Sequence, residues 1–159
     1  MNPLNPFNRG NSFLMFIHFV LMLLLQAPQN VIVGLNDGMR VTVETPDFSG
    51  FIEGTGIDAV LLYHVKTLHG EMPLKTISRI EFLSYEKGKP FQLKVTLRNG
   101  NELDVESERR DFLTIRGKTD LGVVTIKHPD PQTVPLKLTT DKPDRKKSLT
   151  IQYLEFPAP

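Results

Sequence analysis

The sequence predicts an all-β, antiparallel fold that follows a separate N-terminal hydrophobic segment. Side chains of the body alternate with period two, and hairpin turns of the Asn-Gly and Asp-Gly type separate the alternating runs. No window of the body has the apolar spacing of a capped amphipathic helix. Many short strands with regular turn signals predict a sandwich or a barrel.

Residues 91–98 are the clearest strand, with apolar side chains at odd positions and polar side chains at even positions. This strand runs into Asn99-Gly100 and a second strand. Residues 31–36 have the same form and lead into Asp37-Gly38. Both dipeptides favour two-residue hairpin turns, because the central residues of such turns take positive φ.

Further strands are expected along the remainder of the body. The glycine-rich stretch 50–56 lacks the Lys-Ser/Thr ending of a phosphate-binding loop and does not lead into a helix, so it is expected to be a bulge or an irregular connection. The other expected strands are residues 59–67, 71–75, 79–84, 112–117, 122–127, 134–139 and 149–156.

The N-terminal segment has the form of an export signal. The length of its apolar run, residues 13–25, is that of a signal core, which has roughly 7–15 residues. The run is shorter than a membrane-spanning helix, which needs roughly 20 residues. Arg9 precedes the run, and Ala27 is a small residue suited to cleavage. Pro28 disfavours cleavage there. A signal peptide over residues 1–27 and a retained anchor therefore both remain open, and each predicts a periplasmic or extracellular location.

Composition excludes several classes of site. The 159 residues contain no cysteine, so disulfides, thiolate metal sites and cysteine nucleophiles are excluded. Exported domains without disulfides are common in the bacterial envelope, which favours a bacterial source. Of the 19 basic residues only Arg9 lies in the N-terminal segment, which leaves 18 basic against 18 acidic residues in the body. A neutral body lacks the basic excess typical of nucleic-acid-binding proteins.

An internal repeat is predicted from three short blocks that recur in the same order. They define a first copy over residues 31–84 and a second over residues 91–156 that carries an insertion at 128–149. The blocks are residues 35–38 with 97–100 (offset 62), residues 66–70 with 118–122 (offset 52), and residues 76–82 with 150–156 (offset 74).

Each copy resembles the SH3-like and Sm-like small β-barrel modules of uncharacterised secreted bacterial proteins. The resemblance rests on the L-x-[DN]-G turns, the K-T-x-x-G turns and the closing I-x-x-[IL]-E-F strands. It implies a fold of two modules, either packed in tandem or merged into one continuous sandwich. It also implies roles in binding and assembly rather than catalysis.

One set of residues could carry metal chemistry. His64, His69 and Glu71 fall on a probable hairpin, and these residue types can bind zinc. At offset 52 the second copy has Arg116, Leu121 and Val123 instead, and no third histidine lies nearby. Partly exposed strand residues are the favoured interpretation, so no metal or other cofactor is predicted. Glu81 and Glu155 are equivalent in the repeat, but nothing in the sequence pairs them for catalysis.

The insertion at 128–149 is the candidate partner-binding region. It is rich in proline, and its basic residues Arg145, Lys146 and Lys147 could contact an acidic partner or anionic lipid headgroups. The leading hypothesis is a non-enzymatic, exported binding or envelope structural module with a protein or envelope partner. The alternatives are an exported metal-dependent hydrolase that uses His64, His69 and Glu71, and an Sm-like nucleic-acid binder. Residues 13–25 could also associate with a membrane.

Overall fold

The computed structural model of the chain describes residues 30–84, 86, 88–108, 112–128 and 150–158. The predicted signal segment, the expected strand 134–139 and the basic residues Arg145, Lys146 and Lys147 lie outside these residues. No helix in the described part of the chain has both the length and the apolar character needed to cross a membrane.

The described residues form strands joined by turns and by two short 3-10 helices, η1 (Gly56–Asp58) and η2 (Leu74–Thr76). The strands are β1 (Asn30–Leu35), β2 (Arg40–Gly50), β3 (Ile52–Thr55), β4 (Val60–Val65), β5 (Leu68–Pro73), β6 (Ile77–Ser84), β7 (Gln92–Leu97), β8 (Glu102–Ser107), β9 (Leu113–Thr119), β10 (Gly122–His128) and β11 (Ile151–Glu155).

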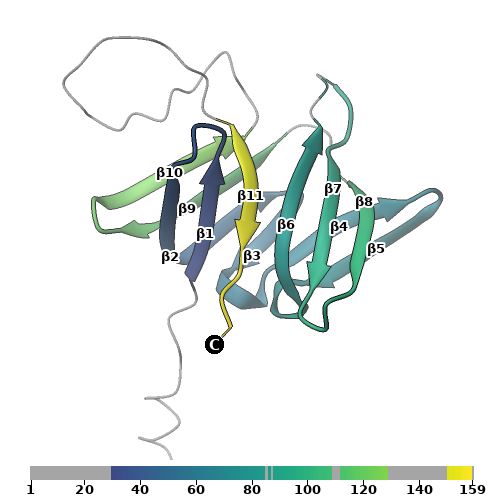
Figure 1. Cartoon of the computed structure of the whole chain (residues 1–159), viewed down its shortest axis with the longest axis horizontal. Coiled ribbons are helices and arrows are strands. Elements are labelled where there is room, and N and C mark those ends of the chain that lie inside the picture. Colours follow the sequence, from purple (N-terminus) through teal and green to yellow (C-terminus); the bar gives the residue numbers. More distant parts are fainter. Residues whose placement is uncertain (1–29, 85, 87, 109–111, 129–149, 159) are drawn as a thin grey trace, which may run out of the picture.

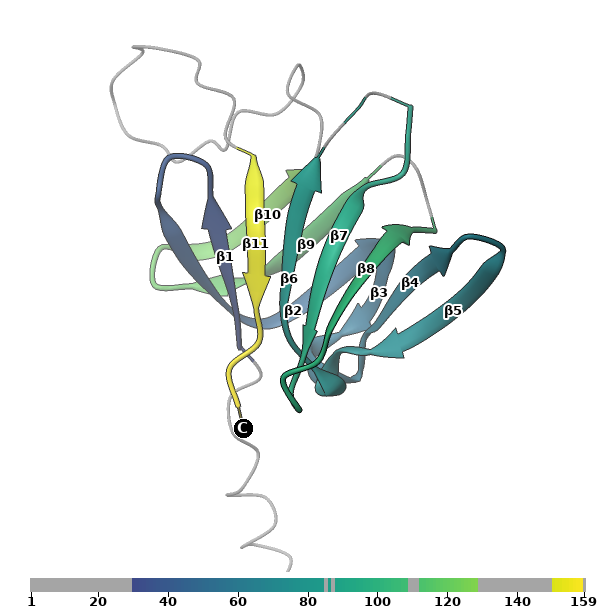
Figure 2. The same ribbon diagram turned by 45° about the vertical axis from the view of Figure 1, so that its right-hand side comes forward.

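These strands make one antiparallel sheet that closes into a small barrel (Figures 1 and 2). The closed path runs β1-β11-β6-β7-β8-β4-β3-β2 and returns to β1, because β2 also pairs with β1. The β9–β10 hairpin extends the sheet from β2 at one end, and β5 extends it from β4 at the other. The prediction of an all-β, antiparallel fold is confirmed. The four-residue strand β3 lies within the glycine-rich stretch where an irregular connection was expected.

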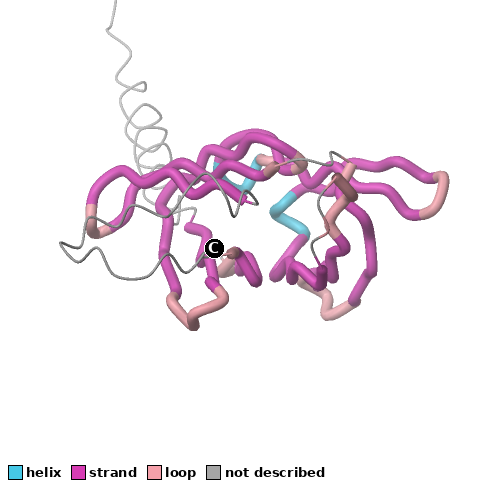
Figure 3. Tube along the Cα trace, turned by 90° about the horizontal axis from the view of Figure 1, so that it is seen from above, coloured by secondary structure: helices cyan, strands magenta, loops and turns pink. Residues whose placement is uncertain are grey.

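The core lies between the front and back layers of strands (Figure 3). Alternate side chains of each strand point inward, as the period-two pattern requires. Phe51 and Phe91 are fully buried, with ring centroids 5.2 Å apart. Ile80 and Leu154, on the central strands β6 and β11, are also fully buried. Each such side chain contributes roughly 1.5–3 kcal/mol through burial.

The neighbouring strand pairs β1–β11 and β6–β7 repeat the same register. Val33 of β1 pairs with Leu154 of β11, and Val95 of β7 pairs with Ile80 of β6. Val33 and Val95 are separated by the repeat offset of 62 residues, and Ile80 and Leu154 by the repeat offset of 74 residues. Ile80 and Leu154 are themselves opposite each other where β6 and β11 pair. The matching pairs are thus related by a local two-fold axis at Ile80 and Leu154.

Two hairpin turns are identical in their hydrogen bonds. Asp37 Oδ1 accepts the Met39 N–H at 2.9 Å, and Asn99 Oδ1 accepts the Asn101 N–H at 3.0 Å. Gly38 and Gly100 have the same φ of 87°, which a glycine adopts without strain. Hairpin turns at Asp37-Gly38 and Asn99-Gly100 are confirmed, but the expected two-residue form is wrong. The Leu35 N–H bonds to the Met39 carbonyl and the Leu97 N–H to the Asn101 carbonyl, so each turn contains three residues, and only its glycine has a positive φ.

The β4–β5 and β9–β10 hairpins correspond at an offset of 54, not 52. The two-residue turn is Lys66-Thr67 in the first hairpin and Asp120-Leu121 in the second. Lys118 and Thr119 are therefore the last residues of β9 rather than a turn. The K-T-x-x-G alignment was wrong by two residues because the same dipeptide occupies a turn in one hairpin and a strand end in the other.

This register changes the counterparts of the three candidate metal ligands. At an offset of 54, the counterparts of His64, His69 and Glu71 in the β9–β10 hairpin are Lys118, Val123 and Thr125. An independent pairing agrees with this, because His64 lies opposite Glu106 of β8 and Lys118 lies opposite Glu44 of β2.

Strands from the two predicted copies interleave in the sheet. One run of neighbours is β10-β9-β2-β1-β11, and the other is β5-β4-β8-β7-β6. In the first run, β2 and β1 belong to the first predicted copy, and β10, β9 and β11 belong to the second. In the second run, β8 and β7 belong to the second copy, and β5, β4 and β6 belong to the first.

Candidate functional site

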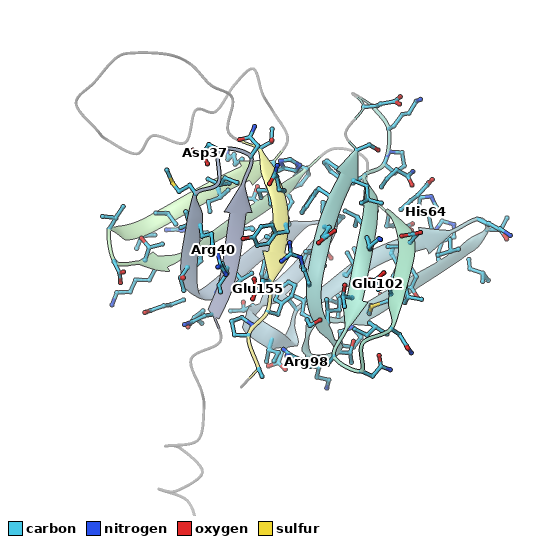
Figure 4. The ribbon with its side chains drawn as sticks, viewed as in Figure 1. Asp37, Arg40, His64, Arg98, Glu102 and Glu155 are labelled. Atoms are coloured by element: carbon cyan, nitrogen blue, oxygen red, sulfur yellow. The ribbon has the colours of Figure 1, made fainter. Side chains whose placement is uncertain are left out.

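The β4–β5 end of the barrel carries two histidine–glutamate pairs. His64 Nε2 lies 2.7 Å from Glu106 Oε2, and His69 Nδ1 lies 2.6 Å from Glu108 Oε2. The two imidazole rings face each other across the hairpin, with centroids 5.6 Å apart. Gln92 Nε2 donates a hydrogen bond of 2.6 Å to the other oxygen of Glu106. Figure 4 labels His64 at this end of the sheet.

These contacts hold Glu106 in its ionised form. The hydrogen bond from Gln92 has the largest effect and lowers the pKa of Glu106. Burial opposes it, and the hydrogen bond and charge of His64 each lower the pKa by a smaller amount. The His64 side chain is 18% exposed, so one partner of the pair is largely shielded from water. The pairs join the β4–β5 hairpin to β8 at its outer face.

The geometry does not assemble the proposed metal ligands. The carboxylates that contact His64 and His69 belong to Glu106 and Glu108, 42 and 39 residues away, and not to Glu71. Within the described ranges, no three His, Cys, Asp or Glu side chains are placed to hold a metal ion. Sequence spacing missed these carboxylates because β8 reaches the hairpin through tertiary pairing.

At the opposite end, a groove of about 250 Å³ opens between β2 and the β9–β10 hairpin. We call it the β2/β10 groove. It is lined by residues 39–42, residues 119–121, Val124 and Ile126, and most of its surface is apolar. A polar depression of about 360 Å³ lies at the other end of the barrel, next to Gln92 and Glu106.

One cross-strand pair distinguishes the two ends. Tyr63 pairs with Gly70 between β4 and β5, whereas Gly117 pairs with Val124 between β9 and β10. The ring of Tyr63 lies over Gly70, 2.8 Å from the position that a Cβ would occupy there. Val124 is smaller than tyrosine and lines the β2/β10 groove instead of covering it.

Large apolar side chains surround the β2/β10 groove. Leu121 is 78% exposed at the tip of the hairpin, and Met39 is 38% exposed on the facing turn. Val123, which is 69% exposed, lies next to this rim on the outer face of β10. Grouped exposed apolar residues beside a hollow are typical of binding surfaces. Sequence reasoning passed over them, although an apolar residue in the turn Asp120-Leu121 was an available signal.

His128 is a second residue that sequence reasoning did not single out. Its ring stacks on Phe91 at 5.2 Å and meets Phe82 edge to face at 4.8 Å. His128 Nδ1 accepts the Ile151 N–H at 3.3 Å, which fixes the start of β11. Burial lowers the pKa of His128 from 6.5 to about 4, so the ring is neutral near pH 7.

The equivalent glutamates of the repeat are tied to arginines on the front of the barrel. Glu155 contacts Arg40 at 3.2 Å, and Glu81 contacts Arg79 at 2.7 Å. Arg79 also covers the ring of Tyr153 at 3.9 Å. Figure 4 labels Arg40 of β2 and Glu155 of β11, the two strands that flank β1. Arg79 also lies 3.8 Å from Glu155, so these groups form one surface ion-pair network, which stabilises the sheet modestly.

Comparison with known proteins gives no relative from which a role could be carried over. No protein family, no curated protein and no solved structure matches this chain significantly.

Proposed function

We propose that this protein is an exported, non-enzymatic binding module whose β2/β10 groove takes an apolar segment of a protein partner. The observation that carries the proposal is the apolar groove with Met39 and Leu121 exposed at its rim. Leaving such side chains in water sacrifices the free energy of burying them, about 25 cal/mol per Å², which a partner would recover.

The charges of the outer strands favour a protein partner over a nucleic acid. Exposed acidic residues dominate β8 and its surroundings, where phosphate groups would be repelled. They are Glu71, Glu102, Asp104, Glu106 and Glu108. Export is supported by the hydrophobic run at residues 13–25, which follows Arg9 and precedes Ala27.

The chain is further proposed to contain two copies of one SH3-like or Sm-like small-barrel module. Support comes from the matching pairs Val33–Leu154 and Val95–Ile80, and from the equivalent hydrogen-bonded turns at Gly38 and Gly100. In this proposal the copies have exchanged strands, because each five-strand run contains strands of both.

Peptide selection tests the binding function. A display library of random extended peptides is selected on the purified protein and counter-selected on Val124→Phe, which fills the groove from a partly buried position. We expect peptides that bind the wild-type protein and bind the variant at least about tenfold more weakly. Circular dichroism shows whether the variant is folded. Peptides that bind both proteins equally, or no enrichment, would contradict the proposal.

Export has its own test. The intact protein from fractionated cells is weighed by mass spectrometry, which reports its location and its mature N-terminus together. We expect it outside the cytoplasm, beginning either near residue 28 or at residue 1. Recovery of the protein from the cytoplasm alone would contradict the export part of the proposal.

A further inference from the structure

β10 is an edge strand beside the groove. Within the described part of the chain it pairs with β9 alone. The corresponding edge at the other end is β5, which ends in Pro73 and therefore lacks one N–H for pairing. From Gly122 to His128, β10 contains no proline and is rich in β-branched residues. The two edges therefore differ in their ability to accept another strand.

The register shows which backbone groups of β10 face away from β9. The Phe112 carbonyl accepts the Phe51 N–H, so this residue and alternate residues of β9 direct their backbone toward β2 and β3. Thr114, Arg116 and Lys118 share this direction. Their opposite residues on β10 direct their N–H and C=O groups to the open edge. These are Val123, Thr125 and Lys127.

Side chains on the two faces of β10 are of different kinds. Val124 and Ile126 line the groove on the inner face. Lys127 is exposed on the outer face, opposite Thr114 rather than opposite an acid. By contrast, Arg116 lies opposite Asp47 of β2. A strand placed along the edge would therefore meet apolar side chains on the inner face, and Val123, Thr125 and the cation of Lys127 on the outer face.

We infer that the partner binds as an extended strand added to the β10 edge. This inference rests on the proposed function and adds the mode of recognition. Main-chain hydrogen bonds run to Val123, Thr125 and Lys127, while alternate side chains of the partner enter the groove beside Val124 and Ile126. The other side chains lie on the outer face, where one next to Lys127 is acidic. The partner segment thus alternates apolar with polar or acidic residues.

Backbone methylation of a selected peptide tests the inference. A series of peptides carries one N-methyl group each, moved along the chain, because N-methylation removes one N–H and blocks pairing on that side. We expect affinity to fall about tenfold at alternate positions and to change less than about twofold at the positions between. Equal effects at neighbouring positions would overturn strand addition while leaving groove binding intact.

Hydrogen exchange of the full chain identifies the occupant. We expect the amides of Val123, Thr125 and Lys127 to exchange rapidly in the free protein and to become protected when the peptide is added. Protection without peptide that rises with protein concentration would assign the edge to a second copy. Concentration-independent protection without peptide would assign it to the chain itself. Either outcome overturns the inference.

Charge reversal tests the acidic preference. For an acidic peptide we expect Lys127→Glu to weaken binding about two- to fivefold, with the matched variant Lys75→Glu unchanged, because Lys75 is exposed on η2 and remote from β10 in sequence. Equal effects of the two variants would reject the contact at Lys127. A peptide that binds Val124→Phe as well as the wild-type protein would instead reject the proposed function itself.

Discussion

The two ends of the barrel share one backbone arrangement and differ in chemistry. At the β4–β5 end, His64 faces Glu106, and the ring of Tyr63 lies over Gly70. At the β9–β10 end, Lys118 and Glu44 occupy the places of the histidine and its acid, and a groove opens beside Val124. Two ends with the same strand pairing can therefore present different side-chain chemistry at their surfaces. A few cross-strand residues decide whether an end is covered or open.

The first prediction concerns the local two-fold that relates the ends. Ile80 and Leu154 are both fully buried and lie opposite each other. We expect Ile80→Ala and Leu154→Ala each to lower the free energy of unfolding by about 2–5 kcal/mol, because each leaves a cavity at an equivalent place. Urea unfolding measures both. A difference of more than about 2 kcal/mol between the two would break the equivalence of the ends.

The second prediction concerns how the stability contributed at the β9–β10 end depends on pH. His128 lies at the counterpart position of Leu74, and burial lowers its pKa from 6.5 to about 4. Between these values the unfolded chain binds a proton that the folded chain does not bind. Stability is therefore lost as pH falls from about 6.5 toward 4, and this group adds no further loss below 4. The expected contribution is roughly 3 kcal/mol.

His128→Leu provides the comparison, because it copies the residue of the other end. The loss of stability between pH 7 and pH 4, measured by urea unfolding, should be smaller in this variant by the contribution of His128. Parallel pH profiles for the two proteins would show that His128 does not titrate as its burial requires.

The third prediction concerns the glycines of the two distinguishing pairs. A Cβ on Gly117 would lie 2.3 Å from Val43 Cγ1 and 2.9 Å from the backbone oxygen of Glu44. The atoms nearest to a Cβ on Gly70 would belong to the partly exposed side chain of Tyr63, which can move. Thermal unfolding should show a loss of about 1–3 kcal/mol for Gly117→Ala and less than about 1 kcal/mol for Gly70→Ala. The reverse order would contradict the packing described here.

The smallest expected effect concerns the acids at the two ends. Glu106→Gln removes a charge that accepts hydrogen bonds from His64 and Gln92, but the side chain is 41% exposed. We expect a loss of about 0.2–1 kcal/mol near pH 7, and less for the counterpart change Glu44→Gln. The loss should diminish at acidic pH, as falling pH protonates the wild-type carboxylate. Equal effects of the two changes would mean that the histidine contact adds nothing.

The sequence predicted the fold where the signal was local. Period-two alternation located most strands, and Asp37-Gly38 and Asn99-Gly100 located two hairpins, because both signals depend only on neighbouring residues. The Lys-Thr dipeptides at Lys66 and Lys118 were aligned with each other, although the first lies in a turn and the second at the end of β9. Lys66 adopts a positive φ of 55° within its turn, which a lysine seldom does, so residue type did not mark that turn.

The candidate site depended on contacts that sequence spacing does not encode. The β2/β10 groove joins residues near 40 with residues near 120, which meet only because β2 pairs with β9. The pairing of His64 with Glu106 likewise follows from the place of β8 beside β4. Burial of His128 depends on the packing of Phe82 and Phe91, which no local pattern specified.

The most direct test of the account compares two matched leucines at the two hairpin tips. Leu121 is 78% exposed beside the groove, and Leu68 is 73% exposed at the opposite end. A peptide selected on the wild-type protein is titrated calorimetrically into Leu121→Asp and Leu68→Asp. We expect Leu121→Asp to weaken binding at least about tenfold and Leu68→Asp to leave it within about twofold. Equal losses, or a larger loss for Leu68→Asp, would contradict the assignment of binding to the β9–β10 end.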